Sequence, residues 1–516
     1  MRIRTCRERE PSMRGGLAAG SPYDKETAVT VYDYDIGVIG GGAAGLTVAA
    51  GTAQLGAGTL LIDREPRLGG DCLHYGCVPS KTLIRTAHVY HLMRRAAEFG
   101  LPSVDLPPPD FLEIARRIRS VIGEIQRHDS VERFCKLGAK VEFGEATFAD
   151  EHSIRLNGSL PSARHWVVAT GSSPAIPAIK GLDETPYLTN REIFSLDRLP
   201  RSLIILGGGP IGIEMAQAFA RLGTDVRVVE SGPRILPRDD RDLTDRVMEV
   251  LASEGVRFCL SSRAVEVRNP GGERQVVLED PNGQRTVVRA EELLVAAGRV
   301  ANIRGLGLES LGIKFDVKGI SVDSRLRTAR KHIYAAGDVT GLYQFTHAAG
   351  YEGGIVVANT VFRLPRKTDY RRLPWCTYTD PELASIGMNE GMASRAGIEY
   401  SVWTEEFEAN DRSLAEGARD GKIKLILDAR EKALGIQILG PRAGELLGEW
   451  VAALNGQVKL TTLASSIHPY PTLGEINKKV VSSYLSPKIF SERIRKGLRL
   501  FFNLKGRACG TETTSS

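Results

Sequence analysis

The chain has 516 residues, which at about 150 residues per domain predicts three or four domains and excludes a small disulfide-stapled scaffold. Hydrophobic residues make up 42% and charged residues 25%, and no stretch approaches the roughly 18 apolar residues of a membrane span, so an integral membrane protein is excluded. The net charge of +6 is small beside 68 basic and 62 acidic side chains, so it indicates no nucleic-acid partner. We expect small-molecule chemistry.

The cysteines and the first thirty residues bear on the compartment. Seven cysteines are too few and too unevenly spaced for a secreted disulfide framework. They are Cys6, Cys72, Cys77, Cys135, Cys259, Cys376 and Cys509. Residues 1–30 mix basic with acidic side chains and lack the apolar run of a signal peptide. We predict a flexible leader over 1–30 and a cytoplasmic protein.

The first ordered signal is an apolar strand over 34–39 that opens into a glycine turn and a helix. The turn has the G-x-G-x-x-G spacing at Gly40, Gly42 and Gly45, and a second strand ends at Asp63, 23 residues beyond the first glycine. The glycines allow a pyrophosphate to approach the helix N-terminus, and the acid can accept ribose hydroxyls. The pattern predicts a dinucleotide-binding unit.

The same unit recurs later in the chain. A strand over 203–206 leads into Gly207, Gly209 and Gly212, and a second strand ends at Glu230, again 23 residues beyond the first glycine. One such copy can be an ordinary glycine-rich turn, but two copies of identical spacing favour two nucleotide sites. Two dinucleotides in one chain suggest a flavin paired with a nicotinamide, because a relay between two-electron carriers requires both.

A cysteine pair follows the first unit, in the segment from Gly70 to Lys81. A regular helix would place Cys72 and Cys77 about 8–9 Å apart between Cα atoms. Pro79 disturbs the turn before it and allows the helix to distort. At a helix start, the Cys77 thiolate would be stabilised by the helix dipole. Two buried cysteines, or half of a metal site, are the alternatives.

From Gly70 to Lys81 the sequence resembles the redox-active segment of the class I pyridine nucleotide-disulfide oxidoreductases, which include dihydrolipoamide dehydrogenase, glutathione reductase and mercuric reductase. Further segments resemble the same family over about residues 31 to 486. They are Ala169-Thr170-Gly171, Ala297-Gly298-Arg299, Ile333 to Asp338, Tyr378 to Glu382 and Pro471 to Glu475.

The resemblance implies an α/β fold with two Rossmann-like dinucleotide-binding domains and an α+β C-terminal dimerisation domain. The implied domains are FAD-binding over 31–185 and 298–368, NAD(P)-binding over 186–297, and dimerisation over 369–486, with a basic amphipathic tail over 487–516. It also implies a homodimer with a role in cell redox homeostasis. No metal-binding residue is predicted.

Site roles follow from the same resemblance. Cys72 and Cys77 form the redox-active disulfide, with Cys77 against the flavin and Cys72 attacking substrate, and Lys81 pairs with Glu214 beside the flavin. The predicted cofactor-binding residues are Gly40, Gly42, Gly45, Asp63, Lys81, Thr170, Gly171, Gly337 and Asp338 for FAD, Gly207, Gly209, Gly212 and Glu230 for the nicotinamide, and Gly298 at the return to the FAD domain.

Glu230 favours NADH over NADPH, because a carboxylate accepts from a 2′-hydroxyl and repels a 2′-phosphate. Arg227 and Arg234 flank that turn, and either one over a 2′-phosphate would reverse the preference.

The chain departs from disulfide reductases near its C-terminus. Where those relatives carry a histidine base paired with a glutamate, this chain has Tyr470 with Glu475 in register, and the resemblance implies that these two catalytic residues complete the thiol site of the partner in a homodimer. A phenol of pKa about 10 is a poor proton acceptor beside an imidazole of about 6.5. Mercuric reductases are similar at this position but usually end in two adjacent cysteines, whereas Cys509 is single. His74, inside the cysteine loop, is a candidate replacement base.

The last segment, from Ser491 to Lys505, mixes basic and apolar residues at helical spacing and predicts contact with an anionic membrane surface or with its own dimer.

Three functions compete. One is a mercuric reductase-like enzyme that passes electrons from NAD(P)H through FAD to Cys72 and Cys77 and on to a small disulfide or thiol-binding metal ion. The second is a dihydrolipoamide dehydrogenase or other disulfide reductase. The third is a flavin and thiol redox sensor that docks a partner through its tail.

Overall fold

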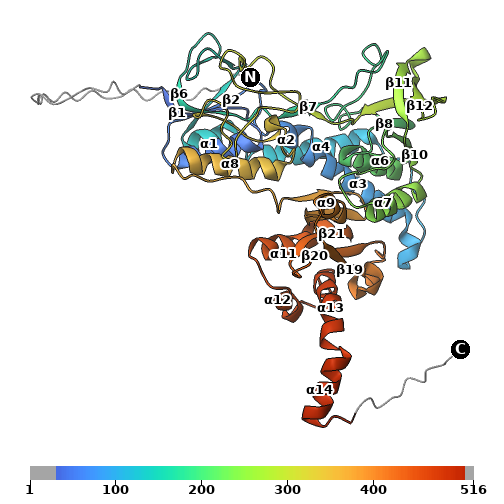
Figure 1. Cartoon of the computed structure of the whole chain (residues 1–516). Helices are drawn as coiled ribbons and strands as arrows, with labels where there is room; N and C mark the ends of the chain where they lie inside the picture. The colour runs from blue at the N-terminus through green and yellow to red at the C-terminus, as the bar shows by residue number, and fades with distance from the viewer. Residues whose placement is uncertain (1–30, 506–516) are drawn as a thin grey trace, which may run out of the picture. The chain divides into compact units, whose positions relative to one another are not determined.

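The structure is a computed structural model that describes residues 31–505 (Figure 1). It contains two compact units. The first unit holds the chain up to Pro233 together with Glu254–Asp369, and the second holds Arg234–Ser253 together with the chain from Tyr370 onward. No helix within residues 31–505 is both long and apolar enough to cross a bilayer.

A parallel five-stranded sheet lies in the first unit. Its central strands are continuous apolar runs, and they are buried on both faces as such runs predict. The sheet order is β16 (Ile333–Ala335), β6 (Ala163–Val168), β1 (Tyr34–Ile39), β2 (Thr59–Asp63) and β3 (Ala139–Phe143). Because every pair is parallel, the strands end at one edge, and Ile39 pairs there with Ile62 and Val168. The glycine turn therefore begins at this edge.

A second parallel sheet in the same unit repeats the arrangement. Its order is β10 (Arg257–Cys259), β9 (Asp225–Val229), β8 (Ser202–Leu206) and β14 (Glu292–Val295). An antiparallel sheet follows it, formed by β11 (Arg263–Arg268), β12 (Arg274–Glu279) and β13 (Arg285–Ala290). Two strand pairs complete the unit, β4 (Thr147–Phe148) with β5 (Ile154–Arg155) and β7 (Ser172–Pro174) with β15 (Arg299–Ala301).

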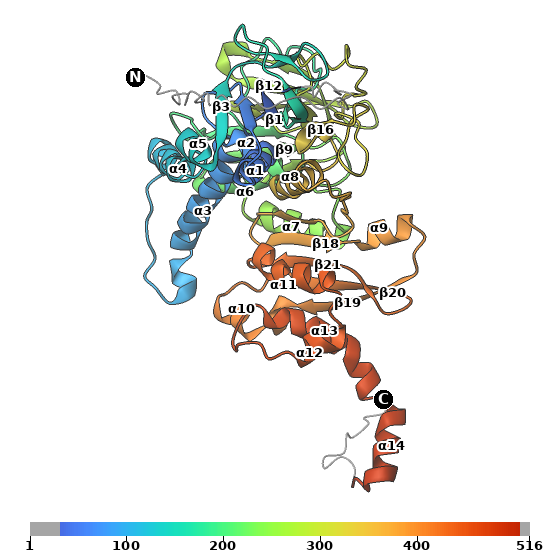
Figure 2. The same ribbon diagram turned by 90° about the vertical axis from the view of Figure 1, so that its left-hand side faces the viewer.

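Helices cover these sheets, and α1 and α8 lie side by side (Figures 1 and 2). A Cβ at Gly353 of α8 would lie 2.9 Å from Cβ of Thr47 in α1, so the two helices pack too closely for a side chain there. The helices of this unit are α1 (Ala43–Gln54), α2 (Gly70–His74), α3 (Cys77–Arg94), α4 (Phe111–Gln126), α5 (Val131–Leu137), α6 (Pro210–Leu222) and α8 (Thr346–Thr360), with 3-10 turns η1 (Ala96–Phe99), η2 (Pro270–Gly272) and η3 (Asp338–Thr340).

The second unit is built on an antiparallel sheet of order β17 (Pro374–Thr377), β18 (Glu382–Gly387), β21 (Ala433–Gly440), β20 (Lys422–Asp428) and β19 (Tyr400–Glu406). Helices pack a buried core against it that includes Trp450 and Ile438. They are α7 (Arg241–Ser253), α9 (Glu390–Arg395), α10 (Asp411–Ala415), α11 (Ala443–Asn455), α12 (Leu460–Ser465), α13 (Glu475–Ile489) and α14 (Glu492–Phe502), with η4 (Phe407–Ala409).

A buried lysine ties α7 to this sheet. Lys424 of β20 is 2% exposed, and its ammonium lies 3.1 Å from an Asp240 oxygen and 2.9 Å from an Asp242 oxygen, with Glu390 as a third carboxylate partner. Burial opposes its charge, but the hydrogen bonds to Asp242 and Glu390 raise the pKa of Lys424 above its usual value. Helix α7 lies inside the range predicted for the NAD(P) domain, yet it belongs to this second unit.

The predicted α/β class, with two parallel Rossmann-like sheets and a separate C-terminal antiparallel unit, is confirmed. The chain returns to the first sheet at β16 after the second one, as the split FAD-binding range requires. The individual domain boundaries stay predictions.

Candidate active site

The first glycine turn is shaped for close backbone approach. Gly40 has φ +114°, and a Cβ there would lie 2.2 Å from the Ala169 carbonyl oxygen. A Cβ at Gly45 would lie 1.8 Å from the Gly40 carbonyl oxygen. Helix α1 begins at Ala43 behind Gly42, which supplies no side-chain cap. The amides of its first turn are therefore available to an anion such as a pyrophosphate.

Asp63 closes this turn from the end of β2. One carboxylate oxygen accepts a hydrogen bond of 2.5 Å from the Gly41 amide, and the other accepts one of 2.8 Å from the Glu65 amide. Burial raises the pKa of Asp63 above its ordinary range. The acid thus fixes the glycine turn itself.

The second turn repeats these contacts. Gly207 has φ +120°, a Cβ at Gly212 would lie 2.1 Å from the Gly207 carbonyl oxygen, and a Cβ at Gly209 would meet nothing within 4 Å. One oxygen of Glu230 accepts a 2.7 Å hydrogen bond from the Gly208 amide, and the other accepts one of 2.7 Å from the Gly232 amide. The two predicted nucleotide sites therefore share one local design.

Of the two arginines beside the second turn, Arg234 is committed elsewhere. Its guanidinium donates to the carbonyl oxygens of Asp239 at 2.9 Å and Pro237 at 2.6 Å. Arg227 is half-buried on β9. Within residues 31–505 the Arg227 guanidinium makes no hydrogen bond, so of the two arginines it alone is available to a 2′-phosphate.

The cysteine segment is broken between its two cysteines. Helix α2 ends at His74, Gly76 has φ −120° and ψ −112°, and α3 begins at Cys77. The expected helix distortion is therefore a complete break. Pro79 lies in the first turn of α3, where a missing N–H leaves no helical hydrogen bond unmade. Cys77 is the first residue of an 18-residue helix.

Cys72 and Cys77 form no disulfide in this structure, and each shifts the pKa of the other. A hydrogen bond from Cys72 lowers the pKa of Cys77 to about 6 against the opposing effect of burial, and a hydrogen bond with Thr346 and the charge of Lys81 act in the same direction. The Thr346 hydroxyl oxygen lies 3.4 Å from the Cys77 sulfur. The same hydrogen bond, with burial, raises the pKa of Cys72. At neutral pH the pair holds one thiolate, on Cys77, and one thiol.

Lys81 and Glu214 form an ion pair of 2.8 Å between α3 and α6. The Glu214 side chain is only 5% exposed, so its carboxylate is buried with this ammonium as a partner. Lys81 therefore lies one turn after Cys77 with its charge held in place.

A set of polar contacts anchors α2 to the rest of the unit. Asn190 is buried, and its amide donates to an Asp71 oxygen and to the Tyr75 carbonyl, both at 3.0 Å. Arg299 pairs with the other Asp71 oxygen at 3.0 Å, and the Arg191 guanidinium lies 4.7 Å from the centre of the Tyr75 ring. The residues on both sides of Cys72 are thus fixed.

Arg299 also joins this segment to Asp338, a predicted FAD-binding residue. Its guanidinium donates to the Ser172 hydroxyl at 2.7 Å, and that hydroxyl donates to an Asp338 oxygen at 2.6 Å. Burial raises the pKa of Asp338. Thr170 exchanges two hydrogen bonds with Asn302, of 2.7 and 2.9 Å.

The remaining predicted glycines lie in the left-handed region, at Gly171 (φ +68°), Gly298 (φ +122°) and Gly337 (φ +81°). The Gly337 amide donates to Glu352 at 2.6 Å. The first unit therefore contains every predicted FAD and NAD(P) residue together with both cysteines.

Tyr470 and Glu475 lie in the second unit. Tyr470 is 71% exposed and donates to Asp411 at 2.9 Å, and this hydrogen bond raises the pKa of Tyr470. Two residues earlier, the His468 ring nitrogen Nε2 lies 3.0 Å from a Glu449 oxygen. Sequence reasoning missed this pair, because nothing in the chain order connects 449 with 468.

His74 is engaged with the backbone. Its Nε2 donates to the Leu68 carbonyl at 2.9 Å, so Nδ1 is the nitrogen that can accept a proton. Thr346 and Asn190 were also missed, since a single threonine or asparagine outside a motif gives no sequence signal.

The other cysteines contribute no second redox pair within the described residues. Cys135, Cys259 and Cys376 are separate, partly buried thiols, and burial raises the pKa of Cys259. Cys6, Cys509 and the predicted leader lie outside residues 31–505.

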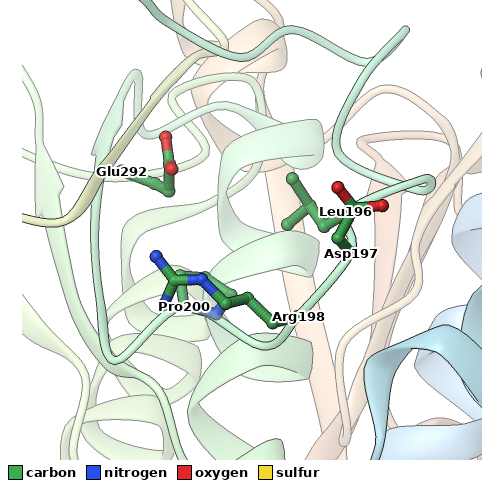
Figure 3. A pocket seen from close by; sticks show the side chains of 5 residues that line it. All are labelled: Leu196, Asp197, Arg198, Pro200 and Glu292. Carbon is green, nitrogen blue, oxygen red and sulfur yellow. The ribbon is translucent and has the colours of Figure 1, made fainter.

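A small cavity of about 160 Å³ lies elsewhere in the first unit, with Glu292 on one side and Leu196 and Asp197 on the other (Figure 3). Arg198 and Pro200 complete its lining, and none of the five residues belongs to the predicted site.

Two family models match the chain. The pyridine nucleotide-disulphide oxidoreductase model covers residues 34–353, and the dimerisation domain of the same family covers residues 373–481. Among curated proteins, the chain is 33% identical to a mercuric reductase of Streptomyces lividans, over 88% of this chain and 96% of that protein. It is also 33% identical to a dihydrolipoyl dehydrogenase of Bacillus subtilis, over 85% of this chain and 96% of that protein.

Solved structures agree with this assignment. The Cu(II) complex of the HOCl-induced flavoprotein disulfide reductase RclA from Escherichia coli is 28% identical and superposes with a TM-score of 0.78, over 87% of this chain and 99% of that one. The predicted family and enzyme class are thereby confirmed. The chain belongs to the pyridine nucleotide-disulphide oxidoreductase family and carries the dimerisation domain of that family.

Proposed function

We propose that this chain uses NAD(P)H and FAD to keep Cys72 and Cys77 reduced, and that the pair reduces a thiol-binding metal ion such as Hg(II). The observation that carries the proposal is the position of Cys77 at the first residue of α3, five residues after Cys72, with the Thr346 hydroxyl 3.4 Å from its sulfur and the Lys81 ammonium one turn further on. Such a pair presents one sulfur anion and one proton-bearing sulfur at neutral pH.

The residues of the first unit fit the two cofactors of the family. The uncapped N-termini of α1 and α6 offer backbone amides to a pyrophosphate, and the Cβ clashes at Gly45 and Gly212 mark turns that only glycine can form. We assign FAD to the Gly40 turn, Asp63, Thr170 and Asp338, and the nicotinamide to the Gly207 turn. FAD, when bound, supplies the two-electron relay between NAD(P)H and the cysteines.

The roles of the protein side chains follow from their contacts. Cys77 keeps its negative charge through Cys72, Thr346 and Lys81. Reduced Cys72 and Cys77 hold two electrons more than their disulfide. Forming the S–S bond reduces one Hg(II) to Hg(0) and releases the Cys72 proton, and two electrons from NAD(P)H restore the thiols. Asn190 and Arg299 hold α2, and therefore Cys72, in place for this exchange.

Tyr470 favours a metal ion over an organic disulfide as acceptor. Its phenol is protonated at neutral pH, because the hydrogen bond to Asp411 raises its pKa further. A metal ion needs thiolates and no base, whereas disulfide exchange needs a base that takes the proton of the attacking thiol and passes it to the leaving thiolate, and a protonated phenol is a poor acceptor. The mercuric reductases among its relatives, and the Cu(II) complex of the similar RclA, support a metal ion as acceptor.

The test is anaerobic reduction of the holoenzyme by NADH, followed by rapid mixing with Hg(II) or with lipoamide. We expect fast reoxidation by Hg(II) and slow reoxidation by lipoamide. Cys72→Ser is the matched control, because it keeps a hydroxyl donor beside Cys77 but cannot form the S–S bond, so it should lose reoxidation by Hg(II). Equal rates for the variant and the native protein would show that the pair is bypassed.

Glu230 supports NADH as the donor. Both of its oxygens are fixed by backbone amides, so the carboxylate cannot swing away from a 2′-phosphate. The ratio of kcat/KM values for NADH and NADPH should therefore exceed one and should fall at least about tenfold in Glu230→Ala. An unchanged ratio would remove this residue from the preference. The cytoplasmic location stays a prediction, and the dimerisation domain supports a homodimer.

A disulfide reductase is the second candidate, and one contact favours it. His468 with Glu449 forms an imidazole and carboxylate pair, the arrangement that disulfide exchange needs in a base. If lipoamide reoxidises the reduced enzyme quickly and His468→Gln abolishes this reaction while sparing reduction by NADH, the disulfide reductase replaces the metal reductase.

A further inference from the structure

The C-terminal helix α14 has an exposed apolar face. Ser491 caps its start by accepting from the Ile494 amide, and none of its residues is buried. It follows α13 and leads away from the sheet of the second unit in both views (Figures 1 and 2). The helix is therefore part of the ordered chain, but its own unit leaves it uncovered.

Four of the five apolar side chains of this helix lie on one side, and the fifth, Leu500, is 80% exposed and lies off this face. Ile494, Leu498, Phe501 and Phe502 stand at spacings of four, seven and eight residues, which an α-helix places on a single face. Their exposed fractions are 43%, 41%, 81% and 69%. A continuous face of this kind is costly in water and is expected to be covered by something.

The rest of the helix is strongly basic. Between 492 and 505 there are five basic residues and one acidic residue, Glu492, which gives a local charge of +4 out of the +6 of the whole chain. Glu492 is paired with Lys496 at 3.1 Å. The other basic residues make no ion pair within residues 31–505, and they are Arg493, Arg495, Arg499 and Lys505. The surplus positive charge therefore remains available to an anionic partner.

We infer that α14 lies in the interface of an anionic lipid membrane, with its apolar face among the acyl chains and its arginines against the lipid headgroups. A lipid surface satisfies both faces at once. A nucleic acid would neutralise the basic side chains but leave the two phenylalanines in water. A second copy of the helix would bring another +4 against the first. The attachment is peripheral, since no described helix can span a bilayer.

Vesicle co-sedimentation of the full-length holoenzyme tests this inference. The vesicles are pure phosphatidylcholine, or phosphatidylcholine with about a third phosphatidylglycerol. We expect binding to the anionic vesicles alone, with loss at high salt because the electrostatic part is screened. Leu498→Ser with Phe501→Ser should lower the bound fraction at least about tenfold, and so should Arg495→Gln with Arg499→Gln.

Two controls accompany the vesicle-binding measurement. Leu160→Ser with Val317→Ser removes apolar side chains of the first unit that are at least as exposed as Leu498 and Phe501, respectively, and it should leave vesicle binding unchanged. NADH-dependent reduction of each variant confirms that it is folded. Because α14 contains no residue of the predicted active site, failure of vesicle binding would leave the proposed electron transfer intact, and the reverse also holds.

Three results would overturn the inference. One is equal binding of the native protein to neutral and anionic vesicles, and another is native-like binding by the Leu498 and Phe501 variant. The third is a combined result: the native protein binds no vesicles, and the Leu498 and Phe501 variant is a monomer in sedimentation velocity where the native protein is a dimer. That result would show that a second copy covers the helix.

Discussion

The hydrogen bond from Cys72 is the largest cause of the low pKa of Cys77, so removing its donor should raise that pKa. The fall from 9.0 to about 6 corresponds to about 4 kcal/mol of preference for the thiolate. Although partial desolvation opposes its charge, Cys77 is exposed by surface area, so solvent screening reduces the effect and we expect about 2 to 3 kcal/mol. Cys72→Ala should therefore move the pKa of Cys77 to about 8.

Cys72→Ser separates the hydrogen bond from the mere loss of a thiol, because serine keeps an O–H donor. The assay is the pH dependence of iodoacetamide alkylation of Cys77 in the reduced full-length protein, followed on the peptide that contains it by mass spectrometry. At pH 7 the alanine variant should react roughly tenfold more slowly than the serine variant. Coincident profiles for the two variants would refute the reasoning and assign the low pKa to Thr346 and Lys81.

Three further perturbations test the packing and charge of the fold. Lys424→Met should lower the free energy of unfolding by about 3 kcal/mol in urea titration, because it leaves Asp240 buried without its cation; an unchanged midpoint would contradict this. Gly45→Ala should abolish FAD binding, measured as flavin absorbance after gel filtration, since its Cβ would lie 1.8 Å from the Gly40 oxygen; full flavin content would show that the turn can adjust. Burial lowers the pKa of His165 to about 4. Between pH 4 and 6.5 the unfolded chain therefore binds more protons than the folded one, and the free energy of unfolding rises with pH across that window by up to about 3 kcal/mol. His165→Leu should flatten this rise in urea titrations at several pH values.

The architecture was predictable from the sequence because local pattern and fold agree in this chain. Two glycine turns with an acid 23 residues later recur as two parallel sheets, and in each the acid accepts from an amide of its own turn. The break before Cys77 could be expected from Pro79, but its position at Gly76 could not. Proline removes a donor without deciding where the helix stops.

The anchors of the redox segment could not be read from the sequence. Asn190 lies 119 residues from Asp71, and Thr346 lies 269 residues from Cys77. Such contacts arise when separate elements pack together, and a single polar residue carries no periodicity that would reveal it. The same reason explains why the pair of His468 with Glu449 was missed, although His468 stands only two residues before Tyr470.

The placement of α7 in the second unit constrains how the molecule can assemble. Asp240 and Asp242 are made early, whereas Lys424 is made only after residues 254–369 have left the ribosome. Until then the two carboxylates have no cation, and the sheet that will hold Lys424 does not exist. During synthesis from the N-terminus, the first unit can therefore fold only with residues 234–253 left outside it. The second unit is therefore not a cassette that a single cut could transplant into another protein.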